Sequence, residues 1–430
     1  MVHMSSMVKL TSSNGNSSSH EGNRHFNNTT TSPTTDAAGN VSVSPETFLE
    51  AAIALKEQVV EATWTELCAG GGEIVDPTIY TGLLGTAFTC LRFYEATGSH
   101  RDLQLSADIV HACATAVTNS SIRYMTFLCG RGGIYALGAV IANHCGDHHK
   151  RSFYLSEFRE LAQERALPAG PKEGGFGMSY DLLHGRAGFL WAALFINKHI
   201  GQETVPYDIL NPIVQAVIAG GRAGAHDDAK CPLMYRWHGT RYWGAAHGLA
   251  GILHVLLHFP LSEDDVEDVK KTLKYMMSKR FPRTGNYPSS EGNARDNLVQ
   301  WSHGAGGMAL TLCKASQVFP HDREFRDAAI EAGEVVWKSG LVEKAGLADG
   351  ASGNAYVFLA LYRLTGDSIY VERANAFGGF LYANARKLIT NTTSHGLDHG
   401  FSLFQGLAGA ACLWSDLVRP EDSRFPGFEI

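Results

Sequence analysis

The hydrophobic positions of this chain fall into two alternating patterns, and each pattern predicts a different kind of helix. The first is a Gly-x-x-Gly element followed by a run that is apolar on nearly all sides, such as GFLWAALFI at residues 188–196. A helix that is apolar all round is buried, so we expect these runs to form the inside of the fold. The element occurs seven times, and its second glycines are Gly85, Gly133, Gly188, Gly251, Gly307, Gly353 and Gly409.

The second pattern lies between successive Gly-x-x-Gly elements and is amphipathic. Its clearest example is SEDDVEDVKKTLKYMM at residues 262–277, where Ser262 and Asp265 form a capping-box-like start. The apolar residues of this segment form one stripe, made of Val266, Val269, Leu273, Met276 and Met277. Before the first repeat, Ser44 is expected to cap a helix that has Pro45 in its first position. We expect these helices to cover the buried ones.

Seven buried helices that alternate with seven amphipathic ones predict an all-α fold. This fold is an α/α toroid, in which an inner barrel of parallel helices is surrounded by an outer layer. The ring is expected to be closed, because no repeat shows the polar face that caps an open solenoid. We expect one toroid domain at residues 44–430, preceded by a disordered polar tail at residues 1–43, which are rich in Ser, Thr, Asn and Gly. Seven membrane spans are excluded, because a span needs about 20 apolar residues and these runs are shorter.

Composition narrows the function without identifying it. The net charge of −7 and the pI near 6.2 argue against a nucleic-acid partner, which needs a basic face. The eight cysteines contain no CxxC pair and most lie in apolar runs, which favours buried, reduced thiols and a cytoplasmic location. The N-terminus has no signal-peptide pattern, and Val2 stands where myristoylation needs a glycine. A transmembrane protein is not expected, whereas peripheral membrane association through the tail stays open.

The residue before the first glycine of each element points to a site. If the repeats are equivalent, these side chains gather at one end of the barrel, the mouth: Thr81, Cys129, His184, His247, His303, Asp349 and Gln405. We expect the first glycine to adopt a conformation that a Cβ would strain, and the second to let neighbouring inner helices approach. The N-termini of the inner helices supply positive partial charge and free N–H groups there, and Arg131 and Arg186 add charge, so an anionic ligand is expected. The histidines fit a functional cavity and satisfied core residues equally well.

Several stretches resemble the lanthionine synthetase C-like (LanC-like) family, most closely its eukaryotic branch and plant members. They are DLLHGRAGFLWAALFINK (181–198), YWGAAHGLAGILH (242–254), LVQWSHGAGG (298–307), GLADGASGNAYVFLALYRLTGD (346–367), FSLFQGLAGA (401–410) and RFPGFEI (424–430). The resemblance covers essentially all of residues 44–430. It implies an α/α toroid with seven inner and seven outer helices, in agreement with the repeats.

The resemblance also implies one zinc ion at the barrel mouth. In the family its ligands come from a Trp-Cys-His-Gly element and a later Cys-His-Gly element, and the zinc lowers the pKa of a thiol that then adds to a dehydroamino acid. In this chain the three ligand positions read Ser302, Ala348 and Asp349, and only the aspartate keeps ligand chemistry. We therefore expect no cofactor, and zinc only at an alternative site. His247, His303 and Asp349 could form one, although hydrogen-bonded histidines are favoured over it.

Other family positions are retained. The resemblance implies that Asp181 and His247 handle protons near the reacting thiol, a task that suits neutral histidine near pH 7. Eukaryotic relatives bind glutathione through a basic region, and here Lys344 is its nearest cation. The candidate catalytic residues are thus Asp181 and His247, and the candidate ligand-binding residues are His184, His303, Asp349, Arg131, Arg186 and Lys344.

Two functions remain, and a third class ranks far behind them. We favour a metal-free LanC-like protein that binds a peptide, glutathione-like or protein ligand at the mouth, with a role in signalling. Without the metal, a thiol of pKa about 8.5 loses its main activator. The alternative is an enzyme that uses zinc to add a thiol, such as that of glutathione, to dehydroamino acids and so forms a lanthionine-type C–S bond. The third class is an unrelated α/α-barrel enzyme, such as a prenyltransferase subunit or a glycosidase. A prenyltransferase would need an intact zinc site, and a glycosidase would need two facing carboxylates, whereas the mouth positions offer only Asp349.

Overall fold

The computed structural model describes residues 43–117, 124–162, 179–225, 230–392 and 399–430. Within these ranges the chain is helical, apart from loops and two isolated β-bridges. The helices of the inner layer are α3 (Leu84–Thr97), α5 (Arg131–His144), α7 (Arg186–His199), α9 (Leu249–Leu256), α11 (Ala305–Val318), α13 (Ala351–Thr365) and α15 (Leu407–Asp416). The predicted tail at residues 1–43 falls, except for its last residue, outside the described ranges.

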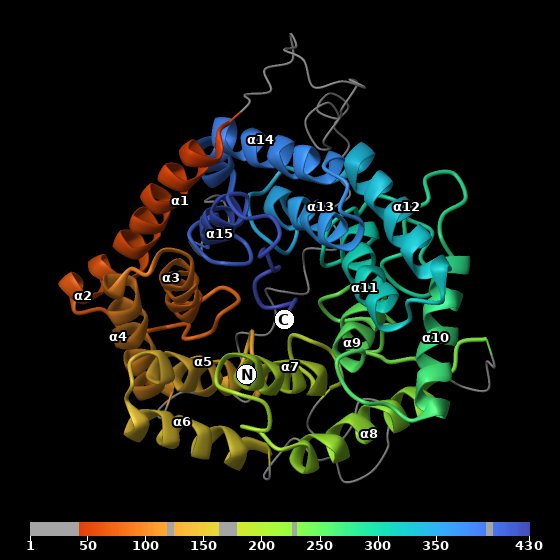
Figure 1. The fold of residues 1–430 in the computed structure, drawn as a ribbon, viewed down its shortest axis with the longest axis horizontal. Helices are drawn as coiled ribbons and strands as arrows, with labels where there is room; N and C mark the ends of the chain where they lie inside the picture. The colour runs from red at the N-terminus through yellow and green to blue at the C-terminus, as the bar shows by residue number, and fades with distance from the viewer. Residues whose placement is uncertain (1–42, 118–123, 163–178, 226–229, 393–398) are drawn as a thin grey trace.

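The outer layer consists of seven helices within the described part of the chain. They are α1 (Pro45–Val60), α4 (His100–Val117), α6 (His148–Leu161), α8 (Tyr207–Gly224), α10 (Glu263–Ser278), α12 (Arg323–Ser339) and α14 (Ile369–Thr392). A π-helical turn (Glu61–Thr65) and the short α2 (Glu66–Gly70) extend α1. Figure 1 shows the two layers as concentric rings, so the predicted α/α toroid of seven inner and seven outer helices is confirmed.

The two sequence patterns sort into the two layers for the expected reason. Every residue of α9 is buried, as its uniformly apolar sequence requires. Helix α10 begins after Ser262, whose hydroxyl accepts the N–H of Asp265 at 3.2 Å, and it buries Val269 and Leu273 on its inward stripe. Helix α1 begins with Pro45, and Ser44 caps it. The helix starts predicted from the capping residues are therefore confirmed.

The ring closes where its first and last helices meet. Outer helix α1 packs against inner helix α15, and α15 packs against α3 (Figure 1). The guanidinium of Arg92 on α3 donates to both carboxylate oxygens of Asp416 on α15, at 2.9 and 2.7 Å. In the loops at the barrel mouth, the N–H of Phe404 donates to the carbonyl of Tyr80 at 3.1 Å. The first and last repeats are thus joined in both the helices and the loops.

The glycines of the repeat allow close backbone approach. A Cβ on Gly188 would lie 2.0 Å from the carbonyl oxygen of Leu182 and 2.7 Å from the Cβ of Thr126 in the preceding repeat. The expectation of a strained first glycine is correct for Gly304, which has φ +89°, and wrong for Gly185, which is extended at φ −112°. At Gly185 the constraint is space, because a Cβ there would lie 2.3 Å from the backbone nitrogen of Asp181.

The C-terminal stretch RFPGFEI fills the inside of the ring (Figure 1). Phe425 and Phe428 are fully buried, and both rings pack against Trp301. The carbonyl of Phe428 accepts the indole N–H of Trp191 at 2.8 Å and lies 3.1 Å from Nε2 of His254. The barrel is therefore a filled core with a mouth at one end, and not an open channel.

Candidate functional site at the barrel mouth

The loops that enter the inner helices already use the N–H groups of the first helical turn. Before α7, the N–H of Arg186 donates to the carbonyl of Ser179 at 2.9 Å, and that of Ala187 donates to Tyr180 at 3.2 Å. The same bond recurs at other repeats, from Leu249 to Tyr242, from Ala351 to Lys344 and from Leu407 to Gly400. The expectation that free N–H groups at these helix starts would bind an anion is therefore wrong, because the entering loop satisfies them. A ligand at the mouth has to be held by side chains.

Asp181 and His247 meet at the mouth. Oδ1 of Asp181 lies 3.2 Å from Nδ1 of His247, and the same oxygen accepts the backbone N–H groups of Leu183 at 3.0 Å and His184 at 2.9 Å. The hydroxyl of Ser179 donates to the other oxygen at 2.5 Å. A carboxylate with this many donors is fixed in place, so it can hold the imidazole of His247 in one orientation.

Aromatic rings stack around this pair. The ring of Trp237 lies 3.8 Å from that of His247, with an angle of 11° between their planes. The ring of His184 lies 5.3 Å from His247 at 10°, and Tyr124 contacts His184 from 4.4 Å. The mouth is therefore lined by flat π surfaces as well as by ionisable groups.

Burial and hydrogen bonding together determine the charges of the side chains at the mouth. Burial would raise the pKa of Asp181, but its hydrogen bond to His247 and the nearby imidazoles outweigh this effect and bring the pKa to about 2. Burial lowers the pKa of His184 to about 4 and that of His303 to about 4. Near pH 7 the aspartate is therefore ionised and these two histidines are neutral.

His303 and Asp349 do not take part in the hydrogen bond between Asp181 and His247. The ring of His303 packs 5.7 Å from that of Tyr242, and its Nδ1 has no hydrogen-bond partner among the described residues. The carboxylate of Asp349 accepts the ammonium of Lys344, so these two predicted ligand-binding residues are paired with each other. His247, His303 and Asp349 do not bring their ligand atoms together, and the alternative metal site suggested by the sequence is therefore not formed.

The residues at the family's zinc-ligand positions do not fit a metal ion. The hydroxyl of Ser302 donates to the carbonyl of Ala348 at 3.0 Å, and the Ser302 N–H donates to the same carbonyl at 2.9 Å. Ala348 offers no side-chain donor and is buried. One carboxylate, on Asp349, is too few ligands for zinc.

The two arginines predicted to add charge at the mouth are held within the fold. Arg186 is fully buried, and its guanidinium lies 4.8 Å from the ring centroid of Tyr180. Arg131 donates to the carbonyl of Val117 at 3.4 Å. Arg186 therefore supports the entry loop of α7 and cannot contact a ligand directly, because none of its surface is accessible.

A different group of three could hold a metal ion at the mouth. Within the described residues, the ligand atoms of Asp181, His184 and His247 all lie within 4.8 Å of one another. Two imidazole nitrogens and one carboxylate oxygen form a donor set that zinc accepts. This group shares two residues with the predicted catalytic pair.

The chain matches the family model described as "Lanthionine synthetase C-like protein" over residues 73–430. It is 65% identical to the LanC-like protein GCL1 of Arabidopsis thaliana over 398 residues, which cover 92% of each chain. The chain belongs to the lanthionine synthetase C-like family. It is also 35% identical to a Danio rerio protein named glutathione S-transferase LANCL1, over 83% of this chain and 85% of that one.

Among solved structures, nisin cyclase matches this member of the LanC-like family with a TM-score of 0.66 at 14% identity. The match covers 85% of this chain and 94% of nisin cyclase, and it shows a shared fold. Within the described part of the chain, none of the helices is both long enough and apolar enough to span a bilayer. Relationship to the family is thus established, while the ligand of this member has to be argued from its own mouth residues.

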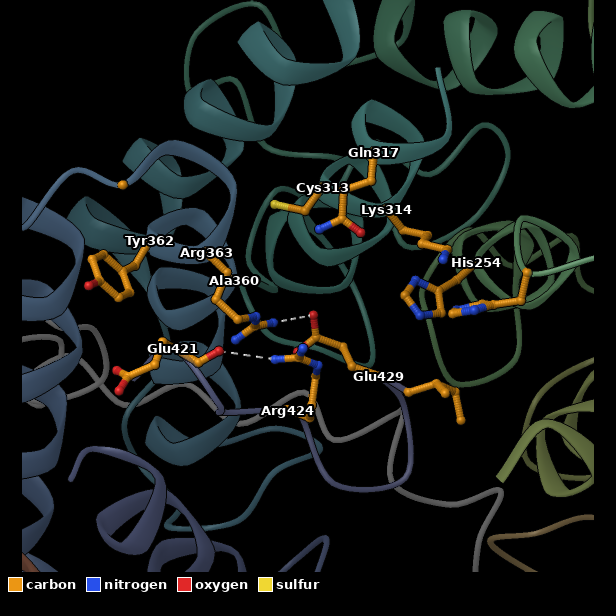
Figure 2. A pocket seen from close by; sticks show the side chains of 13 residues that line it. His254, Cys313, Lys314, Gln317, Ala360, Tyr362, Arg363, Glu421, Arg424 and Glu429 are labelled. Carbon is orange, nitrogen blue, oxygen red and sulfur yellow. Dashed lines mark hydrogen bonds and ion pairs between the residues drawn. The ribbon is translucent and has the colours of Figure 1, made fainter. Parts of the chain in front are cut away.

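This LanC-like chain has a hollow of about 500 Å³ near the C-terminal ends of its inner helices (Figure 2). It is lined by the C-terminal parts of α11 and α13 and by residues near Glu429. Arg363 is paired there with Glu429 at 2.5 Å, and Arg424 donates to the backbone carbonyl of Glu421 at 3.4 Å. Arg363, Glu429 and Arg424 are therefore already partnered within the fold.

Sequence reasoning missed the aromatic part of the mouth. Trp237 belongs to a short turn closed by a bridge to Thr240, and it lies outside every Gly-x-x-Gly element. The available signal was the density of aromatic and histidine residues in RWHGTRYWGAAHG, directly before the retained His247. A ring that stacks on a catalytic histidine can come from any loop, so the repeat pattern alone could not identify it.

Proposed function

We propose that this LanC-like protein binds a short thiol peptide of the glutathione class at its mouth, and that His247, held in place by Asp181, accepts the thiol proton. The observation that carries the proposal is the 3.2 Å contact between Asp181 and His247 beneath the stacked ring of Trp237. The relative named glutathione S-transferase supports the class of ligand.

The pair can do this work without a metal. In its neutral form His247 donates its Nδ1–H to the ionised Asp181, which leaves Nε2 as a proton acceptor. A thiol is mostly protonated near pH 7, so it needs a nearby base to become a nucleophile. The aspartate stabilises the imidazolium that forms, because it stays ionised far below neutral pH.

The aromatic surface supplies the contacts for a peptide. The faces of Trp237 and Tyr124 can pack against the flat amide groups and methylene carbons of a small peptide. The ammonium of Lys344 lies beside Asp349 and can exchange this partner for a ligand carboxylate. This proposal replaces Arg186 by Lys344 as the cation that faces the ligand.

Isothermal titration with reduced glutathione tests the proposal. We expect the wild-type chain to bind, Trp237→Ala to bind at least tenfold more weakly, and His247→Asn to bind but to lose the ultraviolet absorbance of the bound thiolate. His321→Asn, in an exposed turn, is the matched control and should behave as wild type. Absence of binding, or equal affinity and thiolate signal in all four proteins, would refute the proposal.

The second candidate function is zinc-dependent addition of a thiol to dehydroamino acids. The observation in its favour is the grouping of Asp181, His184 and His247, which replaces the missing ligands of the family site. It requires that the purified chain hold zinc, that His184→Asn release it, and that addition of glutathione to a dehydroalanine peptide depend on it. This candidate is excluded if the wild-type chain binds glutathione, and neither its activity nor this binding changes when zinc or a chelator is added.

A further inference from the structure

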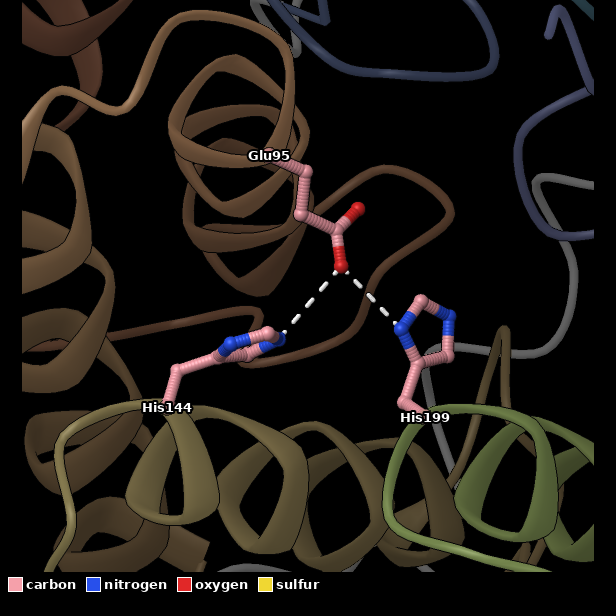
Figure 3. A group of neighbouring side chains, drawn as sticks. All are labelled: Glu95, His144 and His199. Carbon is pink, nitrogen blue, oxygen red and sulfur yellow. Dashed lines mark ion pairs between the residues drawn. The ribbon is translucent and has the colours of Figure 1, made fainter.

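A second cluster of metal-ligating side chains lies at the end of the barrel opposite the mouth. Glu95, His144 and His199 stand in the last turns of α3, α5 and α7, three consecutive inner helices. Figure 3 shows the two imidazoles directed at one oxygen of the carboxylate. None of the three belongs to a Gly-x-x-Gly element or to the site described above.

The distances suit a small divalent ion. Oε1 of Glu95 lies 3.0 Å from Nδ1 of His199 and 3.5 Å from Nε2 of His144, and all three ligand atoms lie within 4.8 Å of one another. In a tetrahedral zinc site with ligands about 2.1 Å from the ion, neighbouring ligand atoms are about 3.4 Å apart. Small side-chain rotations would therefore bring these atoms to ligand geometry.

One of the three ligand atoms makes no good hydrogen bond within the described part of the protein. Nε2 of His144 is buried and has no hydrogen-bond partner among the described residues. Its 3.5 Å separation from Glu95 is longer than a good hydrogen bond. A buried nitrogen that faces a carboxylate at ion-pair distance, beyond the length of a good hydrogen bond, is what a shared metal ion would explain.

The local charges favour a cation. Burial would raise the pKa of Glu95, but its contacts with His144 and His199 outweigh this effect and bring the pKa to about 2. The C-terminal ends of three inner helices add negative partial charge. Arg92, one turn earlier on α3, is the nearby opposing charge, and it is already paired with Asp416.

A metal ion from solvent can reach the three side chains. Glu95, His144 and His199 are 31%, 27% and 24% exposed, so solvent can reach the cluster and provide a fourth ligand. The ring of Tyr94 packs 5.3 Å from His144 and that of Phe195 packs 4.4 Å from His199, and these contacts hold both imidazoles in place. Preorganised rings reduce the entropy lost when a metal binds.

We propose that Glu95, His144 and His199 form a binding site for a divalent transition-metal ion of the zinc class, which ties together the ends of three inner helices. Two imidazoles and one carboxylate, with an open position for water, suit Zn²⁺ and its substitute Co²⁺. The site is independent of any ligand or metal at the mouth.

The test is a titration of the full metal-free chain with Co²⁺, followed by its visible absorption, and with Zn²⁺, followed by calorimetry. We expect His199→Asn and Glu95→Gln to weaken binding at this site at least tenfold. His184→Asn, which disables the possible group at the mouth, is the matched control and should retain this binding. Circular dichroism verifies that each variant is folded.

A thermal readout separates the site from a simple ion pair. Zn²⁺ should raise the Tm of the wild-type chain and of His184→Asn, and should leave the Tm of the double variant His184→Asn with His199→Asn unchanged. The proposal is overturned if the wild-type chain binds neither ion at micromolar concentrations. It is equally overturned if binding persists when His199→Asn or Glu95→Gln is combined with His184→Asn, or if His184→Asn alone abolishes all binding, since the metal would then belong elsewhere.

Discussion

Replacement of Asp416 by alanine should strongly destabilise the ring at its closure. The carboxylate accepts two hydrogen bonds from Arg92 on α3, at 2.9 and 2.7 Å, and one from the hydroxyl of Tyr356 on α13, at 2.8 Å. The side chains of Arg92 and Asp416 are only 19% and 14% exposed, and Tyr356 is fully buried. The change would therefore leave one cation and one hydroxyl with little access to water.

The magnitude follows from the groups left behind. Loss of one partner of a buried ion pair costs about 3–5 kcal/mol, and an unsatisfied hydroxyl costs about 1–3 kcal/mol, but the two costs overlap in one cluster. Because the pair retains some exposure, we expect the free energy of unfolding to fall by about 3 kcal/mol. Combining Asp416→Leu with Arg92→Met should recover most of this loss, because no uncompensated charge remains.

Urea unfolding followed by circular dichroism measures these changes. The quantities to compare are the midpoint and the slope with urea concentration, since an altered slope would reveal an intermediate with an opened ring. Glu324→Ala removes a pair with Lys274, at 2.8 Å, whose two side chains are nearly half exposed, and it should shift the midpoint little. Equal midpoints for Asp416→Ala and Glu324→Ala, or a double variant that is no more stable than Asp416→Ala, would refute the reasoning.

Three further predictions concern the glycines, the buried histidines and the mouth. Gly188→Ala should lower the free energy of unfolding by at least about 2 kcal/mol, because its Cβ would overlap a carbonyl oxygen, whereas Gly70→Ala, in open space, should not; urea midpoints compare them. Burial lowers the pKa of His254 to about 4, so below pH 6.5 the unfolded chain binds a proton that the folded chain does not, and stability falls as the pH drops toward 4. In His254→Gln this slope should decrease by up to about 1.4 kcal/mol per pH unit in a urea series, and an unchanged slope would contradict the assignment. Asp181→Asn should abolish the thiolate signal of bound glutathione in ultraviolet absorbance, and full retention would show that His247 needs no carboxylate.

The fold could be predicted from the sequence because each repeat marks the start of a helix. Each Gly-x-x-Gly element marks the start of one inner helix, and each amphipathic stripe marks one outer helix, so architecture could be read from local pattern alone. The proximity of Asp181 and His247 was inferred from family resemblance. The repeat placed only His247, since Asp181 precedes the equivalent position by three residues.

What the sequence could not supply depends on contacts between loops. The hydrogen bonds that occupy the first-turn N–H groups come from irregular backbone, as at Arg186, and no periodicity encodes them. The cluster of Glu95, His144 and His199 could have been predicted from the sequence. These residues follow the second glycines of three consecutive repeats by 10, 11 and 11 positions. The Gly-x-x-Gly pattern marks only the N-terminal ends of these helices, and the structure shows that the three side chains at the other ends face one another (Figure 3).

The closure of α1 and α3 against α15 has a consequence for how the protein is made. Arg92 and Asp416 are 324 residues apart, so α1 and α3 leave the ribosome long before their partner α15 is synthesised. Until α15 emerges, the growing chain is a curved strip with an apolar edge at each end, which is the kind of surface that chaperones bind. Any translation pause late in the message lengthens that exposure. We therefore expect the yield of folded protein in cells to depend more on chaperone supply during synthesis than on the stability of the finished ring.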